Sequence, residues 1–297
     1  MRMSLNNVSR GRVRSPLSVL LYGVEGVGKS SWGADAPAPV FLDLEDGTEE
    51  LDVARFPRPE SWSDVLAALD ALAREQHQYQ TVVIDTLDAL ERLIQREVCR
   101  SGGKQSIEDF GYGKGYVAAS ELAAVFVQRL EALRRKGMHV VCLAHAQIRA
   151  FSDPAGDSYD KYRIKGHDKF TSLFKEWAKA VLFANYRVYT VSKDGKTKAL
   201  GDGARVVYTE PRPAWEAKNR YGLPTELPLN WHEFERSARA GEEALPRLVA
   251  TVEELLARAP AELAERGRAA LERSGQEPAK LARLADWLRN KLAQEAA

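Results

Sequence analysis

Residues 23–30 read Gly23-Val24-Glu25-Gly26-Val27-Gly28-Lys29-Ser30, which matches the pattern G-x-x-x-x-G-K-[ST] at every position. Glycines in such a loop let backbone N–H groups converge on phosphate oxygens, and the N-terminus of the following helix adds a partial positive charge. The lysine reaches the β- and γ-phosphates, and the serine hydroxyl ligates Mg²⁺. This loop, together with Ser31, therefore predicts a site for ATP and Mg²⁺.

Short strands and longer helices alternate on both sides of this loop. Runs of consecutive apolar, β-branched residues are typical of strands buried on both faces of a parallel sheet, and they occur at 18–22, 40–44, 81–85 and 139–143. Helical patterns lie between them, around 29–33, 61–75, 87–100 and 116–136. This order predicts an α/β fold with a mostly parallel central sheet and right-handed crossovers.

The pattern changes after residue 180. Residues 181–191 and 205–209 read as two strands of an antiparallel hairpin that extends the sheet, with 192–203 as its polar turn. From Trp231 onward the chain is rich in Ala, Leu, Glu and Arg, and breaks near 260 and 274–278 predict two or three helices. We divide the chain into a basic arm (1–17), an ATPase core (18–232) and a C-terminal helical segment (233–297).

Composition excludes several classes of protein. Apolar residues make up 44 % of the chain and charged residues 29 %, which excludes wholesale disorder. No run approaches the ~18 apolar residues of a membrane span, so no membrane partner is expected. Forty-three basic and 42 acidic residues give a net charge of +1, so any basic surface must be local. Cys99 and Cys142 lie far apart in apolar surroundings, as expected for thiols of a reducing cytoplasm.

Two predicted strands end in acidic residues. Asp85 ends the third apolar run. A carboxylate at the tip of a parallel strand beside the loop strand is suited to hold Mg²⁺ together with the loop serine. ATPases of the AAA+ class place a glutamate directly after this aspartate, but Thr86 occupies that position here. Another carboxylate must therefore orient the attacking water. We assign this role to Glu45, at the end of the second strand, with Asp43 as the rival.

This arrangement of motifs resembles the RecA-type ATPase core. The segments FLDLEDGTEEL, TVVIDTLDALERL, GYGKGY, HVVCLAHAQ and AKNRYGLP are similar to phage-encoded RecA-like nucleotide-binding proteins, and the resemblance covers roughly residues 15–235. Members of that group serve as recombination or single-strand annealing ATPases. The resemblance thus implies a RecA-like P-loop core, homo-oligomers in the form of filaments or rings, and location in the cytoplasm of a bacterial host if the chain is phage-encoded.

The resemblance also implies further catalytic residues. In RecA-like proteins the fourth strand ends in a polar residue, usually Gln, that senses the γ-phosphate; the nearest matches are His145 or Gln147. RecA-type recombinases and DnaB-type helicases carry a Lys-Asn-Lys or Lys-Asn-Arg segment that reaches the ATP of the adjacent subunit. Lys218 and Arg220 match this segment, and cations supplied in trans are worth ~10³–10⁵ in rate for arginine fingers.

Two loops are expected to bind DNA. By position they are 101–115 and 147–167, where cations and aromatic residues are interleaved in a way that suits single strands better than duplex readout. The predicted contact residues are Lys104, Tyr112, Lys114, Arg149, Lys161, Arg163 and Lys165. The arginine-rich start of the chain could add contacts to the DNA backbone or form a disordered arm, and its arginines are Arg2, Arg10, Arg12 and Arg14.

These features favour an ATP-dependent, homo-oligomeric ATPase that binds single-stranded DNA during recombination or strand annealing, with hydrolysis stimulated by DNA. A single-strand-binding protein is a candidate partner. Two alternatives remain open on the same core: a ring-forming translocase or helicase-loading ATPase, and a regulatory module that binds ATP without DNA. Hydrolysis that is stimulated by DNA would exclude the regulatory module. Annealing of complementary oligonucleotides would favour the recombination ATPase, and directional unwinding would favour the translocase.

Overall fold

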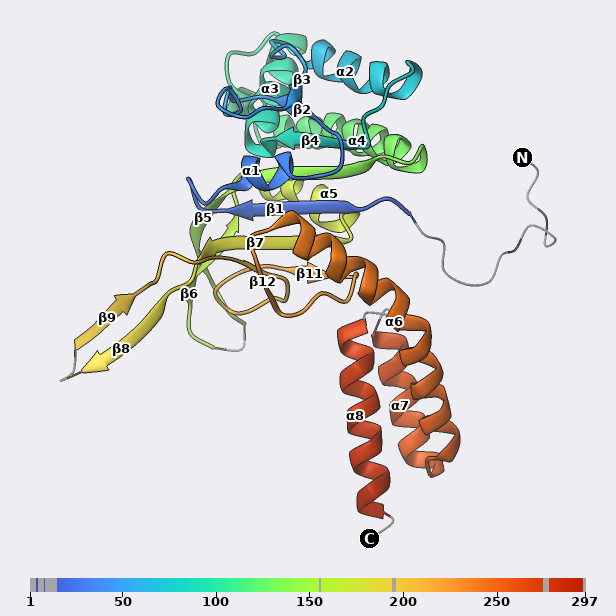
Figure 1. The fold of residues 1–297 in the computed structure, drawn as a ribbon. Coiled ribbons are helices and arrows are strands. Elements are labelled where there is room, and N and C mark those ends of the chain that lie inside the picture. Colours follow the sequence, from blue (N-terminus) through green and yellow to red (C-terminus); the bar gives the residue numbers. More distant parts are fainter. Residues whose placement is uncertain are drawn as a thin grey trace.

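A largely parallel sheet forms the centre of the protein, seen in a computed structural model that describes residues 15–154, 156–193, 196–274 and 278–295 together with Ser4 and Val8 (Figure 1). Its parallel strands are β1 (Ser18–Gly23), β2 (Pro39–Asp43), β3 (Ala54–Arg55), β4 (Thr81–Asp85), β5 (His139–Phe151) and β7 (Ala180–Tyr186). Antiparallel strands extend it at β7: β10 (Arg205–Tyr208), β11 (Lys218–Asn219) and β12 (Glu226–Pro228). The main path runs β12-β10-β7-β1-β5-β4-β2-β3.

Four helices cover one face of this sheet (Figure 1). They are α2 (Trp62–Arg74), α3 (Leu87–Ser101), α4 (Lys114–Arg135) and α5 (Asp168–Trp177). Each contributes apolar side chains at helical spacing to one continuous core, where Val65, Leu90, Phe126 and Phe174 share a cluster with Leu20 of β1. These helices therefore hold the ends of β4 and β5 in fixed positions.

The other face is covered by α1 (Lys29–Ala34) and by the beginning of α6 (Trp231–Arg258). Successive side chains of a strand point to opposite faces, so Leu21 of β1 enters this second core while its neighbour enters the first. Trp32 of α1 packs here on Trp231 and Phe234, with ring centroids 4.8 and 5.3 Å away. The start of α6 thus supports the short helix that follows the phosphate loop.

The C-terminal helices form a separate small core. The later part of α6 packs with α7 (Ala261–Arg273) and α8 (Pro278–Glu295), and the three extend away from the sheet (Figure 1). One side of α8 carries leucines at helical spacing and faces inward: Leu281, Leu284 and Leu288 are all buried. Helix α6 spans both sides of the expected boundary at 232/233, and its first turns pack in the second core of the sheet. None of the helices in the described part of the chain combines the length and apolar character that a membrane span requires.

The predicted α/β architecture is confirmed, with its parallel sheet, antiparallel extension and helical C-terminus. Three details were predicted incorrectly. Strand β4 does not lie beside β1, because β5 separates them. The expected loop at 147–167 is largely a hairpin between β5 and β6 (Tyr159–Ile164). Most of the expected turn at 192–203 lies in a separate ribbon of β8 (Tyr189–Lys193) and β9 (Lys196–Leu200). Residues 194–195 of this turn and the N-terminal arginines lie outside the described residues.

Candidate functional site

The phosphate loop connects β1 to α1 at the carboxyl edge of the sheet. Its geometry requires glycine at both ends. A Cβ on Gly23 would lie 2.3 Å from the carbonyl oxygen of Ala184 on the adjacent strand. Gly28, the N-cap of α1, has a φ of 101°, in the left-handed region that favours glycine. The loop is thereby pressed against β7 and turned so that α1 begins at Lys29.

Lys29 lies inside this loop and is only 6 % exposed. Its ammonium group donates to the carbonyl oxygens of Gly23 and Val24, at 3.3 and 3.1 Å. Burial lowers the pKa of Lys29, and the negative charge of Asp85 opposes this shift without cancelling it. The side chain is therefore held in the loop, with its charge directed to the region where the matched motif binds phosphates.

Ser30 and Asp85 come together as predicted for an Mg²⁺ site. The hydroxyl of Ser30, on α1, donates to Oδ2 of Asp85 over 2.6 Å, even though β5 lies between β1 and the strand that ends in Asp85. Burial raises the pKa of Asp85 to about 6, although the hydrogen bond from Ser30 opposes the shift. A hydroxyl and a carboxylate oxygen are ligands that Mg²⁺ prefers. These two residues therefore fit the expected ion.

Glu45 stands just beyond β2. One carboxylate oxygen accepts a hydrogen bond from Nη2 of Arg92 on α3 at 2.8 Å, and the other lies 3.8 Å from Nδ1 of His145. Its rival Asp43 is turned into the following loop, where it accepts hydrogen bonds from the backbone of Glu45 and from the hydroxyl and backbone of Thr48. Burial favours a higher pKa for Asp43, but these hydrogen bonds lower it. Asp43 thus shapes the turn that presents Glu45.

Asp88 is a site residue that the sequence did not reveal. It lies in the first turn of α3, is 3 % exposed, and accepts hydrogen bonds from the backbone N–H of His145 at 3.1 Å and from the imidazole Nδ1 at 3.1 Å. Burial would raise the pKa of Asp88, yet these hydrogen bonds lower it to about 2. Glu45, Asp88 and His145 bring one ligand atom each within 4.8 Å of one another, a set able to hold a metal ion. Thr86, in the position of the AAA+ glutamate, caps α3 instead.

The two candidate γ-phosphate sensors occupy different surroundings. His145 pairs with Gly23 across the boundary between β5 and β1, beside the phosphate loop. The amide of Gln147 donates to the carbonyl oxygens of Ile164 and Gly166 in the hairpin, at 3.1 and 3.4 Å. Of the two, His145 contacts the acidic groups of the site, whereas Gln147 stabilises the hairpin.

Two further residues beside the loop were not predicted. A Cβ on Gly28 would lie 2.9 Å from Nη1 of Arg205 at the start of β10, so this guanidinium packs against the loop. The hydroxyl of Tyr186 donates to the carbonyl oxygen of Gly26 at 3.1 Å. Tyr186 ends β7 and Arg205 begins β10, and neither residue belongs to a recognisable sequence motif. They lie beside the phosphate loop because β10 pairs with β7, with Arg205 opposite Tyr186.

Lys218 and Arg220 do not approach the phosphate loop of their own chain. Lys218 pairs with Val181 in the first half of β7, whereas the end of β1 pairs with Ala184. The ammonium of Lys218 donates to two carbonyl oxygens at the end of α5, both at 2.8 Å. Arg220 is exposed. Action on ATP by these cations therefore requires a second copy of the chain.

The first expected DNA segment lies between α3 and α4 and is partly folded. It contains the short helix η2 (Ile107–Phe110), capped by Ser106. Tyr112 is fully exposed, with a backbone φ of 49°, and Lys104 and Lys114 are exposed as well. An exposed aromatic ring flanked by cations is a suitable stacking platform for a nucleobase.

The second expected DNA segment is the β5–β6 hairpin, and its cations are partly neutralised. Arg149 and Arg163 lie 3.9 and 3.1 Å from Asp168. Lys165 is 3.8 Å from Asp88, and Lys161 sits over the ring of Phe151. Register places Arg149 opposite Lys161 on one face of the hairpin. Directly after the first segment, the ring of Tyr116 stacks on His167 at the end of the second, with centroids 4.0 Å apart.

A family model described as an AAA domain, AAA_24, matches residues 15–221. The SPbeta prophage-derived uncharacterized protein YorG of Bacillus subtilis (strain 168) is 25 % identical over 147 residues, which span 48 % of this chain and 44 % of that protein. Among solved structures, the RadB recombinase aligns with a TM-score of 0.37 and 12 % identity, covering 65 % of this chain and 80 % of that chain. The KaiC-like protein PH0186 from Pyrococcus horikoshii OT3 aligns with a TM-score of 0.36 and 14 % identity over 68 % of this chain and 84 % of that chain.

Proposed function

The chain belongs to the AAA_24 family of AAA domains, and from this premise we propose that it is a RecA-type ATPase that binds single-stranded DNA. Its role is in phage-type recombination or strand annealing, as a homo-oligomer with ATP bound between copies. The prophage origin given for the Bacillus subtilis relative supports the phage setting. We place the protein in the host cytoplasm, with single-stranded DNA and a single-strand-binding protein as partners.

One observation carries the DNA part of this proposal. Strand β5 runs without interruption from the middle of the sheet, past His145 at the nucleotide site, to the hairpin that holds Arg149. A contact at the γ-phosphate that shifts the end of β5 is thereby passed to the hairpin, and DNA on the hairpin acts back on the nucleotide site. Such coupling is reciprocal for binding free energies.

The chain's own residues divide the catalytic work. Lys29 and the loop N–H groups bind the phosphates, and Ser30 with Asp85 holds Mg²⁺, which neutralises charge on the β- and γ-phosphate oxygens when bound. Glu45 orients the attacking water, and His145, 3.8 Å away, senses the γ-phosphate. Lys218 and Arg220 of the adjacent copy stabilise the negative charge that develops on the transferred phosphoryl group.

Tyr112 offers a direct test of DNA binding. Its ring is fully exposed, so any nucleobase can stack on it. Such a stacking contact is worth ~1–3 kcal/mol per base. Replacement by alanine should weaken the binding of a labelled oligonucleotide by about 5- to 150-fold. Tyr112→Phe keeps the aromatic face and should bind nearly as tightly as the wild type. Equal affinities of the alanine variant and the wild type would remove Tyr112 from the DNA surface.

The function itself is tested by the rate of ATP hydrolysis with and without single-stranded DNA. We expect stimulation by single strands, little stimulation by duplex, and accelerated annealing of complementary oligonucleotides. Directional unwinding without annealing would favour the ring translocase. ATP turnover that does not respond to DNA, with no oligonucleotide binding, would favour the regulatory module and contradict the proposal.

A further inference from the structure

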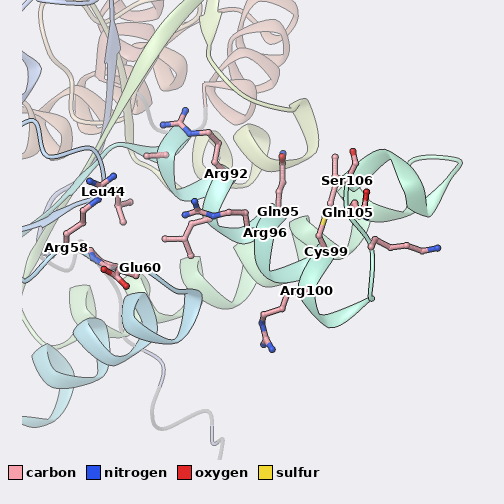
Figure 2. A pocket seen from close by; sticks show the side chains of 15 residues that line it. Leu44, Arg58, Glu60, Arg92, Gln95, Arg96, Cys99, Arg100, Gln105 and Ser106 are labelled. Carbon is pink, nitrogen blue, oxygen red and sulfur yellow. The ribbon is translucent and has the colours of Figure 1, made fainter.

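A basic pocket lies along α3, outside the phosphate loop itself. It has a volume of about 920 Å³ and is lined by five cationic residues, Arg58, Arg92, Arg96, Arg100 and Lys104, against a single acidic one, Glu60. We call it the α3 pocket. Figure 2 shows Arg92, Arg96 and Arg100 along α3, with Arg58 and Glu60 on the segment that leads into α2.

The arrangement of these cations follows from helix geometry. Arg92, Arg96 and Arg100 recur every four residues, so they occupy one side of α3 at intervals of ~6 Å. The row is therefore ~12 Å long, which is more than a single phosphate group can span. A row of this length is typical of a site for an extended anion with several charged groups, not of a site for one small anion.

The charge of the pocket is only partly neutralised. Arg100 pairs with Glu97 at 2.7 Å, Arg92 pairs with Glu45 at 2.8 Å, and Arg58 pairs with Asp46. Within the described part of the chain, Arg96 makes neither an ion pair nor a side-chain hydrogen bond, and the same holds for Lys104. Unpaired guanidinium and ammonium groups in one concave surface attract a polyanion, and guanidinium binds phosphate oxygens in a bidentate manner.

Continuity with the first DNA segment identifies the polyanion. Lys104 lines the pocket and also belongs to the segment 101–115, which carries the exposed ring of Tyr112. Gln105 and Ser106 add neutral donors at the same end of the pocket. A strand whose base stacks on Tyr112 can therefore continue its backbone into the α3 pocket, where phosphates meet the arginine row.

Arg92 connects this pocket to the catalytic site. Its guanidinium lines the pocket, holds Glu45 at 2.8 Å and lies 3.7 Å from the buried carboxylate of Asp88. Arg92 is 57 % exposed, and an ion pair with so exposed a partner is weak enough for a phosphate to displace. When Arg92 pairs with a phosphate instead, one carboxylate oxygen of Glu45 is released. Glu45 is the residue assigned to orient the attacking water.

We propose that the α3 pocket binds the sugar–phosphate backbone of single-stranded DNA and that Arg92 reports its occupancy to Glu45. This inference rests on the proposed function and adds its mode of regulation. With the pocket empty, the ion pair with Arg92 restrains Glu45 from orienting the attacking water, and the rate of hydrolysis is low. With DNA bound, Arg92 turns to a phosphate and hydrolysis accelerates.

The binding step is tested by fluorescence anisotropy of a labelled oligo(dT) at several salt concentrations. Each phosphate contact to a single strand contributes about 0.7 to the slope of log K against log salt. The double variant Arg96→Ala, Arg100→Ala should therefore reduce the slope by about 1.4. Arg74→Ala, which removes an 80 % exposed arginine near the end of α2, should keep the wild-type slope. An unchanged slope in the double variant, or equal competition by polyglutamate, would overturn the assignment of the pocket to DNA.

The coupling step is tested with Arg92→Gln, which keeps a polar side chain but loses the charge. We expect a severalfold higher rate of hydrolysis without DNA and a smaller ratio of stimulated to basal rate, while Arg92→Lys should return toward the wild type. An unchanged ratio in Arg92→Gln would refute the coupling. If wild-type protein neither binds oligo(dT) nor hydrolyses ATP faster in its presence, the proposed function itself is wrong. If wild-type protein does both, and the variants bind and respond to oligo(dT) as the wild type does, only the inference about the α3 pocket is wrong.

Discussion

Replacing Glu45 by glutamine tests the choice of catalytic base. The variant keeps the size and hydrogen-bonding capacity of the side chain but loses the negative charge that orients and activates water. General-base catalysis contributes about 10²–10⁴ to the rate, so the barrier should rise by about 3–5 kcal/mol. The structural loss is small, because the pair with the 57 % exposed Arg92 is worth less than about 1 kcal/mol. Turnover should therefore collapse in a folded protein that still binds ATP.

The assay is single-turnover hydrolysis of radiolabelled ATP, with ATP affinity measured separately by a fluorescent analogue. Glu50→Gln is a matched control, because Glu50 is an exposed acid in the same loop. It should hydrolyse ATP at the wild-type rate. A Glu45→Gln rate within about tenfold of the wild type, at equal ATP affinity, would move the base to another group of the site, with Asp88 the nearest acid around His145.

Four further outcomes are expected. Lys29→Ala should weaken ATP binding by at least about tenfold, because a charged hydrogen bond to phosphate is worth ~1.5–3 kcal/mol; calorimetry with ATP checks this. Mixing Arg220→Ala with Lys29→Ala should restore part of the activity that each lacks alone, and no recovery in demonstrably mixed oligomers would argue against a shared site. Trp32→Ala should lower the free energy of unfolding by ~3–5 kcal/mol in urea titrations, because the side chain is 2 % exposed between two aromatic rings. Hydrogen bonds from Arg134 lower the pKa of Glu131 to about 2, so this contact stabilises the fold above pH 4.5 and its contribution is lost as the pH falls toward 2; Glu131→Gln should flatten that part of the stability curve.

Local patterns in the sequence were sufficient for the buried strands β1, β2 and β4 and for the first half of β5. Consecutive apolar residues such as Val82 and Val83 indicate strands buried on both faces, and both are fully buried, in the two opposite cores. The order of strands was not contained in these patterns, because the side-chain period of a strand does not identify its neighbour. The insertion of β5 between β1 and β4 therefore became visible only in three dimensions.

The β5–β6 hairpin illustrates a signal that was present but overlooked. Gln147, Arg149 and Phe151 share one face of β5, and a turn with Asp153 and Pro154 follows. Alternation of period two before such a turn is a hairpin pattern even when the residues are polar. The many charged residues led to the prediction of a loop. A strand that extends beyond the core of the sheet buries no apolar face, so it lacks the apolar pattern by which strands are recognised.

Other site residues had no sequence signal at all. The contact between Asp88 and His145 joins residues 57 positions apart, and it forms because α3 begins beside the end of β5. Arg205 reaches the phosphate loop only because β10 pairs with β7. By contrast, Ser30 and Asp85 were predicted as partners from motif chemistry and lie within hydrogen-bonding distance.

The most direct measurement is the rate of ATP hydrolysis per chain as protein concentration is raised, with and without single-stranded DNA. A site completed by cations of a neighbouring copy and activated by DNA predicts a rate that climbs with concentration and climbs further with oligonucleotide. A constant rate per chain down to concentrations at which the protein is monomeric, the same with and without oligonucleotide, would contradict it.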